Sequence, residues 1–66
     1  MYLTKENLHL LTAQAGIYLF LDKDEHVLYV GKAKNLSKRV KSYFRPTGLN
    51  TKTLAMVQHI AYIKTV

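Results

Sequence analysis

The segment from residue 16 to residue 44 decides the fold, and it reads GIYLFLDKDEHVLYVGKAKNLSKRVKSYF. Its apolar runs 17–21 and 27–31 have the length and the β-branched and aromatic content of strands that are buried on both faces. The polar residues 22–26 between them are typical of a short connection. The two runs therefore predict an antiparallel β-hairpin.

A helix is predicted over residues 35–44. Asn35 is suited to the N-cap, because its side-chain oxygen can accept a hydrogen bond from the first helical turn. At about 100° per residue, one apolar stripe forms from Leu36, Val40, Tyr43 and Phe44. Arg39 falls on the border of this stripe, one turn before Tyr43, whereas Lys38 and Lys41 point towards water.

The flanking segments complete the predicted fold. Thr4 is suited to begin a short helix, and Pro46 is expected to end the helix 35–44. Thr51 is expected to cap a further helix over 52–61, and residues 62–66 read as a last strand, left as an exposed edge. The prediction is an α/β (α+β) domain, with a small, mainly antiparallel three-stranded sheet flanked by helices.

The length and composition set outer limits. Sixty-six residues form one small domain, taken as residues 1–66, and the absence of cysteine excludes disulfides, thiolate zinc sites and cysteine nucleophiles. No apolar run approaches the roughly 20 residues that cross a bilayer, and the polar amino terminus does not resemble a signal peptide. These features predict a soluble, cytoplasmic protein.

The charge is unevenly distributed along the chain. Ten basic residues stand against four acidic ones, a formal charge of +6, and all four acids lie within the first 25 residues. The segment from His26 to Val66 carries basic residues and no acidic ones. Such a one-signed segment attracts polyanions and favours nucleic-acid binding, although a solvated basic surface would have the same composition.

The tyrosines suggest where a site could form. In an antiparallel hairpin the start of one strand lies beside the end of the other, and the helix 35–44 follows at once. We therefore expect one cluster to form from Tyr18, Tyr29, Lys32, Arg39 and Tyr43. The alternative is that the tyrosines are amphipathic residues at the edge of the core and that Lys32 and Lys34 are merely solvated.

Several motifs carry a resemblance to a known family. Gly16-Ile17-Tyr18 and Tyr29-Val30-Gly31 stand one hairpin apart, and Lys32-Ala33-Lys34 and Ser42-Tyr43-Phe44 follow. In this arrangement the whole chain resembles the GIY-YIG nuclease family, in the branch that serves bacterial nucleotide excision repair. Its second motif here is Tyr-Val-Gly, a small apolar departure.

The resemblance implies metal-assisted hydrolysis of DNA phosphodiesters. Tyr29 would be the general base, and the ammonium of Lys32 would favour its phenolate form. Arg39 would bind the scissile phosphate, while Tyr18 and Tyr43 orient water or phosphate. Gly16, Ile17 and Gly31 would be structural motif residues. Contacts to the DNA backbone are expected from Lys32, Lys34, Lys38, Arg39 and Lys41.

The family's metal ligand, a glutamate on a helix after the last strand, is expected beyond Val66. None of the acids present, Glu6, Asp22, Asp24 and Glu25, is expected to replace it. Magnesium or manganese would thus serve the complete domain and not bind this chain firmly, and cleavage by this chain alone would be weak. By resemblance, the partners are damaged duplex DNA, cut on the 3′ side of the lesion, and a subunit of the UvrB type.

Two other functions stay open at this point. One is a non-catalytic module in which the lysines and Arg39 simply neutralise phosphates. The other is a structural or protein-interaction domain that self-associates through an exposed sheet edge. The second leaves the clustered positive charge without a cause.

Overall fold

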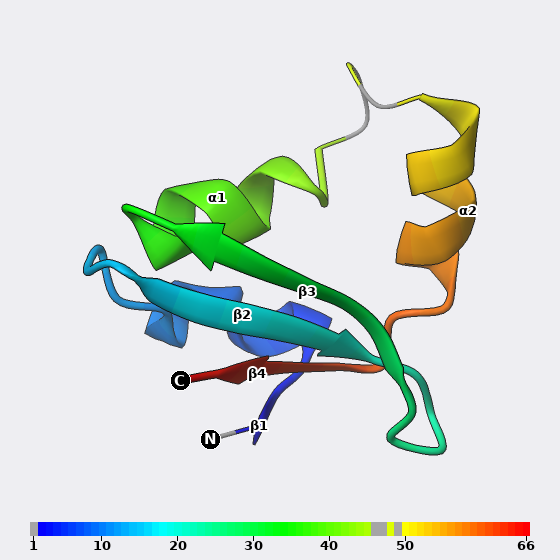
Figure 1. Ribbon diagram of the computed structural model, residues 1–66, viewed down its shortest axis with the longest axis horizontal. Helices are drawn as coiled ribbons and strands as arrows, with labels where there is room; N and C mark the ends of the chain where they lie inside the picture. Colours follow the sequence, from blue (N-terminus) through cyan, green and yellow to red (C-terminus); the bar gives the residue numbers. More distant parts are fainter. Residues whose placement is uncertain (1, 46–47, 49) are drawn as a thin grey trace.

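A four-stranded antiparallel sheet forms the centre of the computed structural model, which describes residues 2–45, 48 and 50–66 (Figure 1). The strands are β1 (Tyr2–Leu3), β2 (Gly16–Leu21), β3 (Val27–Ala33) and β4 (Tyr62–Thr65), in the spatial order β1-β4-β2-β3. The predicted α+β class is confirmed. The predicted number of three strands is wrong, because the two-residue β1 is too short to give a sequence pattern.

The position of β4 also differs from the prediction. It pairs with β1 on one side and with β2 on the other, so it lies inside the sheet and is not an exposed edge. Beyond the strand, the backbone N–H of Val66 still donates to the carbonyl of Ile17 at 2.9 Å.

The predicted hairpin of β2 and β3 is confirmed. Gly16 pairs with Ala33 at one end and Phe20 pairs with Tyr29, after which a register shift marks an irregularity next to the turn. In the turn, the side chain of Asp22 accepts hydrogen bonds from the backbone N–H groups of Asp24 and His26.

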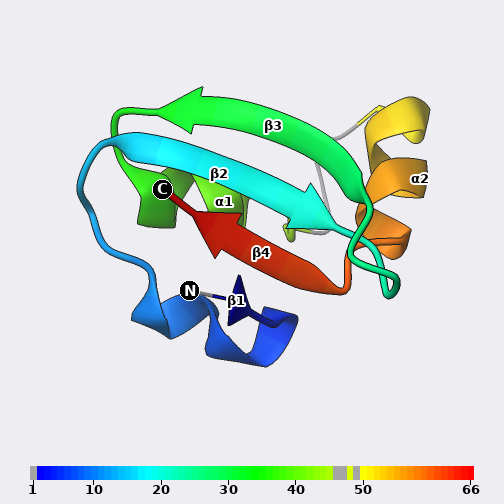
Figure 2. The same cartoon turned by 60° about the horizontal axis from the view of Figure 1, so that its bottom comes forward.

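Strand β3 is not the buried strand that its apolar run predicted. It is an edge strand without a fully buried residue, and the side chains of Tyr29 and Val30 are 43% and 53% exposed. In Figure 2 the sheet is seen face on, and no helix of the described residues lies in front of it. A continuous apolar run shows that a strand forms, but not how many of its faces are covered.

The two segments that flank the hairpin in the chain fold into helices. The first, η1 (Lys5–Leu10), is a 3₁₀ helix that begins after Thr4, as predicted. The second, α1 (Leu36–Ser42), has the predicted N-cap, because Oδ1 of Asn35 accepts from the backbone N–H of Lys38 at 3.0 Å. It ends two residues before the predicted Phe44, and Tyr43 is its C-cap.

The last helix, α2 (Thr51–Gln58), begins one residue earlier than predicted. Asn50, and not Thr51, is the cap, since its side chain accepts from the backbone N–H of Thr53 at 2.8 Å. The helix also ends before residue 61, because the backbone N–H of Ala61 already donates to the sheet at Leu21. The predicted helix stop at Pro46 lies outside the described residues.

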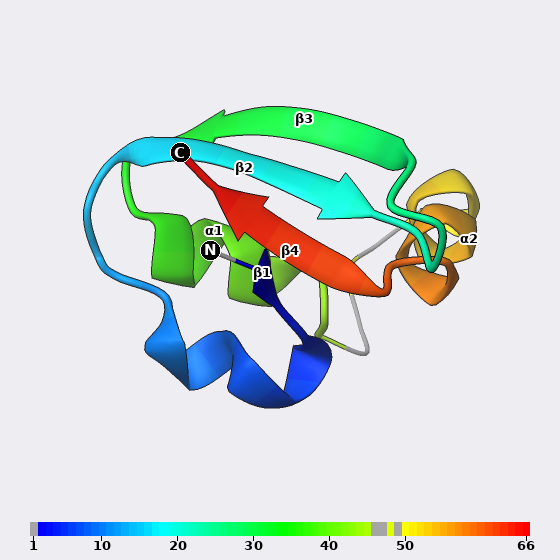
Figure 3. The same cartoon turned by 90° about the horizontal axis from the view of Figure 1, so that it is seen from below.

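The core lies between one face of the sheet and the pair η1 and α1, which Figure 3 shows together on that side. From α1 it receives Leu36 and Val40, two of the residues of the predicted apolar stripe. Its other buried members are Leu3, Leu11, Tyr18, Phe20, Tyr43, Ile60 and Ile63. Within the part of the chain that is described, no helix has the length and apolar character needed to span a membrane.

Candidate active site

Tyr18 lies in the middle of β2, with its side chain only 1% exposed. Its ring lies against the backbone of Gly31, the residue opposite it on β3. A Cβ atom at position 31 would lie 2.7 Å from Cε1 of Tyr18 and closer still to Cζ and Oη. The glycine of the second motif is therefore required because it lets the strand pass over a buried phenol.

Three tyrosines from three different elements surround this point. The hydroxyls of Tyr18 and Tyr43 are hydrogen-bonded at 3.1 Å, although the residues are 25 positions apart in the chain. The ring centroid of Tyr29 lies 6.2 Å from those of both Tyr18 and Tyr43. Phe20 lies against the group, with its centroid 5.0 Å from that of Tyr43. The hairpin and α1 together thus produce the predicted tyrosine cluster.

Arg39 joins this cluster from α1, one helical turn before Tyr43. Its Nη2 donates to the hydroxyl of Tyr43 at 3.4 Å, and its Cζ lies 5.2 Å from the centroid of that ring. The oxygen of Tyr18, and after it that of Tyr43, raise the pKa of the guanidinium. Arg39 is exposed and permanently charged, so it can bind an anion that approaches from solvent.

The buried and exposed tyrosines suit different roles. Burial, reinforced by the hydrogen bond with Tyr18, raises the pKa of Tyr43 well above its ordinary value of 10.0. A phenol is already protonated near neutral pH, and the shift keeps Tyr43 protonated to higher pH still, so its hydroxyl can donate to a phosphate oxygen. Tyr29 is 43% exposed, against 8% for Tyr43 and 1% for Tyr18, so among these three its side chain is the most accessible to a water molecule.

The raised pKa of Tyr43 predicts a loss of stability in alkali. Above pH 10 the unfolded chain releases this proton while the folded chain keeps it, so the free energy of unfolding falls as pH rises. This residue contributes at most about 1.4 kcal/mol per pH unit. Urea unfolding of the wild type and of Tyr43→Phe should therefore give a stability difference that shrinks above pH 10. A difference that stays constant to pH 11.5 would contradict the role of burial.

Lys32 does not join the cluster in the way that was expected. It pairs with Ile17 across the hairpin, and successive side chains of a strand point to opposite faces. Position 32 is an odd number of residues from both Tyr29 and Gly31, so its side chain leaves β3 on the uncovered face of the sheet. The register therefore gives no support to Lys32 as the activator of Tyr29.

Two hollows flank the tyrosine cluster. The first, of about 460 Å³, is lined by Lys34, Asn35, Lys38, Arg39 and Ser42. The second, of about 300 Å³, is lined by Leu28, Tyr29, Tyr43, Lys52, Thr53 and Met56. The sequence prediction missed Asn35 and Ser42 as site residues, and it missed the contribution of α2 altogether. Lys41, predicted to contact DNA, lines neither of them.

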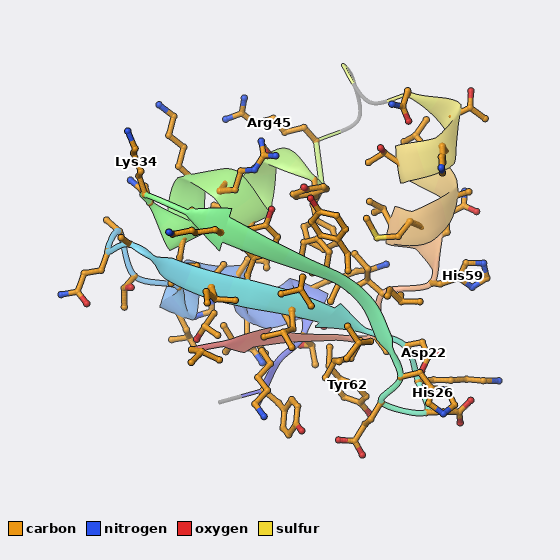
Figure 4. The ribbon with its side chains drawn as sticks, in the orientation of Figure 1. Asp22, His26, Lys34, Arg45, His59 and Tyr62 are labelled. Atoms are coloured by element: carbon orange, nitrogen blue, oxygen red, sulfur yellow. The ribbon has the colours of Figure 1, made fainter. Side chains whose placement is uncertain are left out.

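The carboxylates lie elsewhere. Asp22 and Asp24 share the β2–β3 turn with His26, and their ligand atoms lie within 4.8 Å of one another. In Figure 4 Asp22 and His26 lie at the opposite end of the hairpin from Lys34. Along an extended strand, Asp22 is roughly 13 Å from Tyr18. Because divalent magnesium needs carboxylate oxygens, the residues present at the tyrosine cluster do not by themselves form a magnesium site.

The two tripeptide motifs meet where Tyr18 lies against Gly31. Together with the tyrosine cluster and Arg39 on the following helix, they define a GIY-YIG domain. A family model described as the UvrC-like GIY-YIG domain matches residues 14–66. This chain belongs to that family.

Known relatives agree with this assignment. The chain is 52% identical over 60 residues to UvrABC system protein C of Mycoplasma capricolum, a match that covers 91% of this chain and 10% of that protein. It is 54% identical over 54 residues to the protein of that name from Pseudomonas putida strain W619, covering 82% and 9%. The chain thus spans about a tenth of the length of these relatives.

A solved structure has the same fold. It is the GIY-YIG N-terminal endonuclease domain of UvrC from Thermotoga maritima, bound to magnesium as its catalytic divalent cation. The TM-score is 0.77 at 29% sequence identity, and the match covers 94% of this chain and 66% of that one. A point mutant of that domain is also described as bound to its catalytic divalent cation, with the same coverage of both chains.

Proposed function

We propose that this chain forms the phosphate-binding and water-activating part of a DNA endonuclease domain. The observation that carries the proposal is the convergence of the Arg39 guanidinium with the hydroxyls of Tyr18 and Tyr43. Fixed donors of this kind stabilise charge that develops on a phosphoryl oxygen. The cut would be the 3′ incision of bacterial nucleotide excision repair.

In the proposed reaction, Arg39 binds a non-bridging oxygen of the scissile phosphate. Tyr43, held protonated by its burial, donates to the same group, and Tyr18 fixes the position of the Tyr43 hydroxyl through their mutual hydrogen bond. Tyr29, acting as a phenolate, takes a proton from the water that attacks phosphorus, and the leaving-strand oxygen takes up a proton from solvent as its P–O bond breaks. Lys32 has no assigned role at the reacting atoms.

The motif glycines and Ile17 position these groups. Gly31 makes room for Tyr18, and a Cβ at Gly16 would lie 2.9 Å from both Cδ1 of Leu36 and the carbonyl oxygen of Val66. We propose that Gly16 is needed for the contact of β2 with α1 and with the end of the chain. Ile17, on the opposite face and 40% exposed, supports the strand and does not touch the cluster.

A divalent cation, magnesium or manganese, is proposed for the complete domain. The cluster offers hydroxyls and a guanidinium, and the four acids of the chain lie on η1 or in the hairpin turn. A carboxylate ligand from outside these 66 residues would therefore be needed.

The natural partners are proposed to be damaged duplex DNA and a subunit of the UvrB type, in the cytoplasm. Copies of this chain could also pair through the open edge of β3, since an edge strand presents unpaired backbone groups. Light scattering at several concentrations would detect such pairing.

A second candidate function is a phosphate-binding module without catalysis. The observation in its favour is the absence of a carboxylate from the cluster. It assigns no chemical purpose to the buried pair of hydroxyls from Tyr18 and Tyr43.

A plasmid nicking assay with magnesium tests the proposal. The 66-residue chain should bind DNA in a salt-dependent manner but nick it weakly, whereas a chain extended to the length of the solved domains should nick it at least about a hundredfold faster. Robust turnover by the 66-residue chain would overturn the need for an external ligand. A longer chain that binds but never nicks would favour the binding module.

A further inference from the structure

The larger hollow beside the cluster is formed by one face of α1 and the end of β3. Asn35, Lys38, Arg39 and Ser42 are spaced i, i+3, i+4 and i+7, so they lie on one side of the helix, and Lys34 closes the end. The volume of about 460 Å³ is open to solvent on the side where Lys34, Lys38 and Arg39 are exposed. A charged ligand can therefore enter without any rearrangement of the fold.

The charge of this hollow is not balanced by nearby acids. It gathers three cations, and every acidic residue of the chain lies between residues 6 and 25, on η1 or in the hairpin turn. Among the residues that the structure describes, one ion pair forms within 4 Å. It joins His26 to Asp22, at the other end of the hairpin from Lys34. Three like charges around one hollow repel each other, so an anion bound between them is stabilised by all three.

The polar side chains of the hollow are already oriented by the helix. Oδ1 of Asn35 caps α1, which makes Nδ2 the atom of this amide that can donate to an anion. The hydroxyl of Ser42 donates to the carbonyl of Arg39, so it is engaged with the helix and not available as a donor. The available donors are thus the amide of Asn35, the two ammonium groups and the guanidinium.

Arg39 connects this hollow with the tyrosine cluster. One side of its guanidinium donates to Tyr43, and the same side chain forms a wall of the hollow. We propose that the hollow is a second phosphate subsite, which holds the DNA backbone phosphate next to the one that reacts. The inference rests on the proposed function and adds to it the path of the bound strand, which runs from the tyrosines along α1 towards Lys34.

The proposed subsite gives different roles to lysines that the sequence alone does not distinguish. Lys34 and Lys38 line the hollow, whereas Lys41, on the same helix and equally charged, does not. Lys38→Met and Lys41→Met are therefore a matched pair, because both remove one exposed charge from α1 and both keep the apolar stem. Lys34→Met is a second variant within the proposed subsite.

Two short oligonucleotides test the proposal on the chain as it is. TpT has one phosphodiester and TpTpT has two, and neither has a terminal phosphate. Binding is measured by titrating the backbone amide signals of the ¹⁵N-labelled protein in low salt. We expect TpTpT to bind about fivefold more tightly than TpT. The gain should disappear in Lys38→Met and Lys34→Met and persist in Lys41→Met.

The possible outcomes distinguish the subsite from the proposed function. If TpT shifts the amide signals of Arg39 and Tyr43 but TpTpT binds no more tightly, the subsite is overturned and the proposed function stands. If neither oligonucleotide shifts those signals, both are overturned. An equal loss in Lys38→Met and Lys41→Met would show general charge attraction and overturn the subsite. TpTpT with one uncharged methylphosphonate linkage should bind the wild type like TpT.

Discussion

Replacing Arg39 by alanine is expected to slow DNA cleavage about a hundred- to a thousandfold, the usual effect of removing one fixed donor to a developing oxyanion. The expectation follows from the position of the guanidinium, which donates to Tyr43 at 3.4 Å and faces solvent where a phosphate would bind. The rate should be measured under single-turnover conditions with magnesium, in a chain extended to the length of the solved domains. Such conditions report the chemical step and not product release.

Lys38→Ala is the matched control for this experiment. Lys38 is the preceding residue of α1 and carries the same charge. It lines the neighbouring hollow, whereas the hydrogen bond to Tyr43 comes from Arg39. It should weaken DNA binding and change the single-turnover rate at saturation by less than about fivefold. Arg39→Lys keeps the charge but loses the planar fork, and it should restore only part of the rate. Similar, modest rate effects of Arg39→Ala and Lys38→Ala would favour a binding module over an enzyme.

The replacement Gly31→Ala should lower the free energy of unfolding by about 3 kcal/mol, at the upper end of the cost of overpacking a core. The added methyl group would overlap the ring of Tyr18, which is 1% exposed and packed in the core. The hydrogen bond between the hydroxyls of Tyr18 and Tyr43 would be displaced as well. Urea denaturation followed by circular dichroism measures the change.

Lys32→Ala is the control for the glycine replacement. It changes the adjacent residue of β3 on the uncovered face, where an exposed side chain makes little contribution to packing. Its effect should stay within about 0.5 kcal/mol. If Gly31→Ala is as stable as the wild type, β3 can move away from Tyr18, and the close approach described above is not required. A large effect of Lys32→Ala would contradict its assignment to the uncovered face.

Local patterns predicted most of the fold. The apolar runs predicted the hairpin, and Asn35 predicted the start of α1. Both were predictable because strand formation and helix capping depend on residues that are close in the sequence. The strand β1 and the interior place of β4 could not be predicted, since both depend on pairing between residues about 60 positions apart. The cap of α2 was misplaced because Asn50 and Thr51 are both good capping residues and only the backbone geometry selects one.

The candidate site was predictable in its members but less so in their orientation. The spacing of the motifs predicted that Tyr18, Tyr29 and Tyr43 lie together with Arg39. In the structure these side chains do lie together. The face of Lys32 was predictable as well, because an odd separation from Tyr29 places it on the other side of any regular strand. The polar face of α1 was visible at helical spacing, whereas the hollow against α2 depends on long-range packing.

The interior place of β4 affects the order in which this chain can fold while the ribosome synthesises it. Protein synthesis runs from the amino terminus, so the hairpin and α1 emerge while residues 62–65 are still unmade. During that interval β1 has no strand to pair with, and one side of β2 is open. The tyrosine pair can form early, but the sheet closes only when β4 inserts between its two neighbours, which makes this insertion a late event in the folding of the sheet.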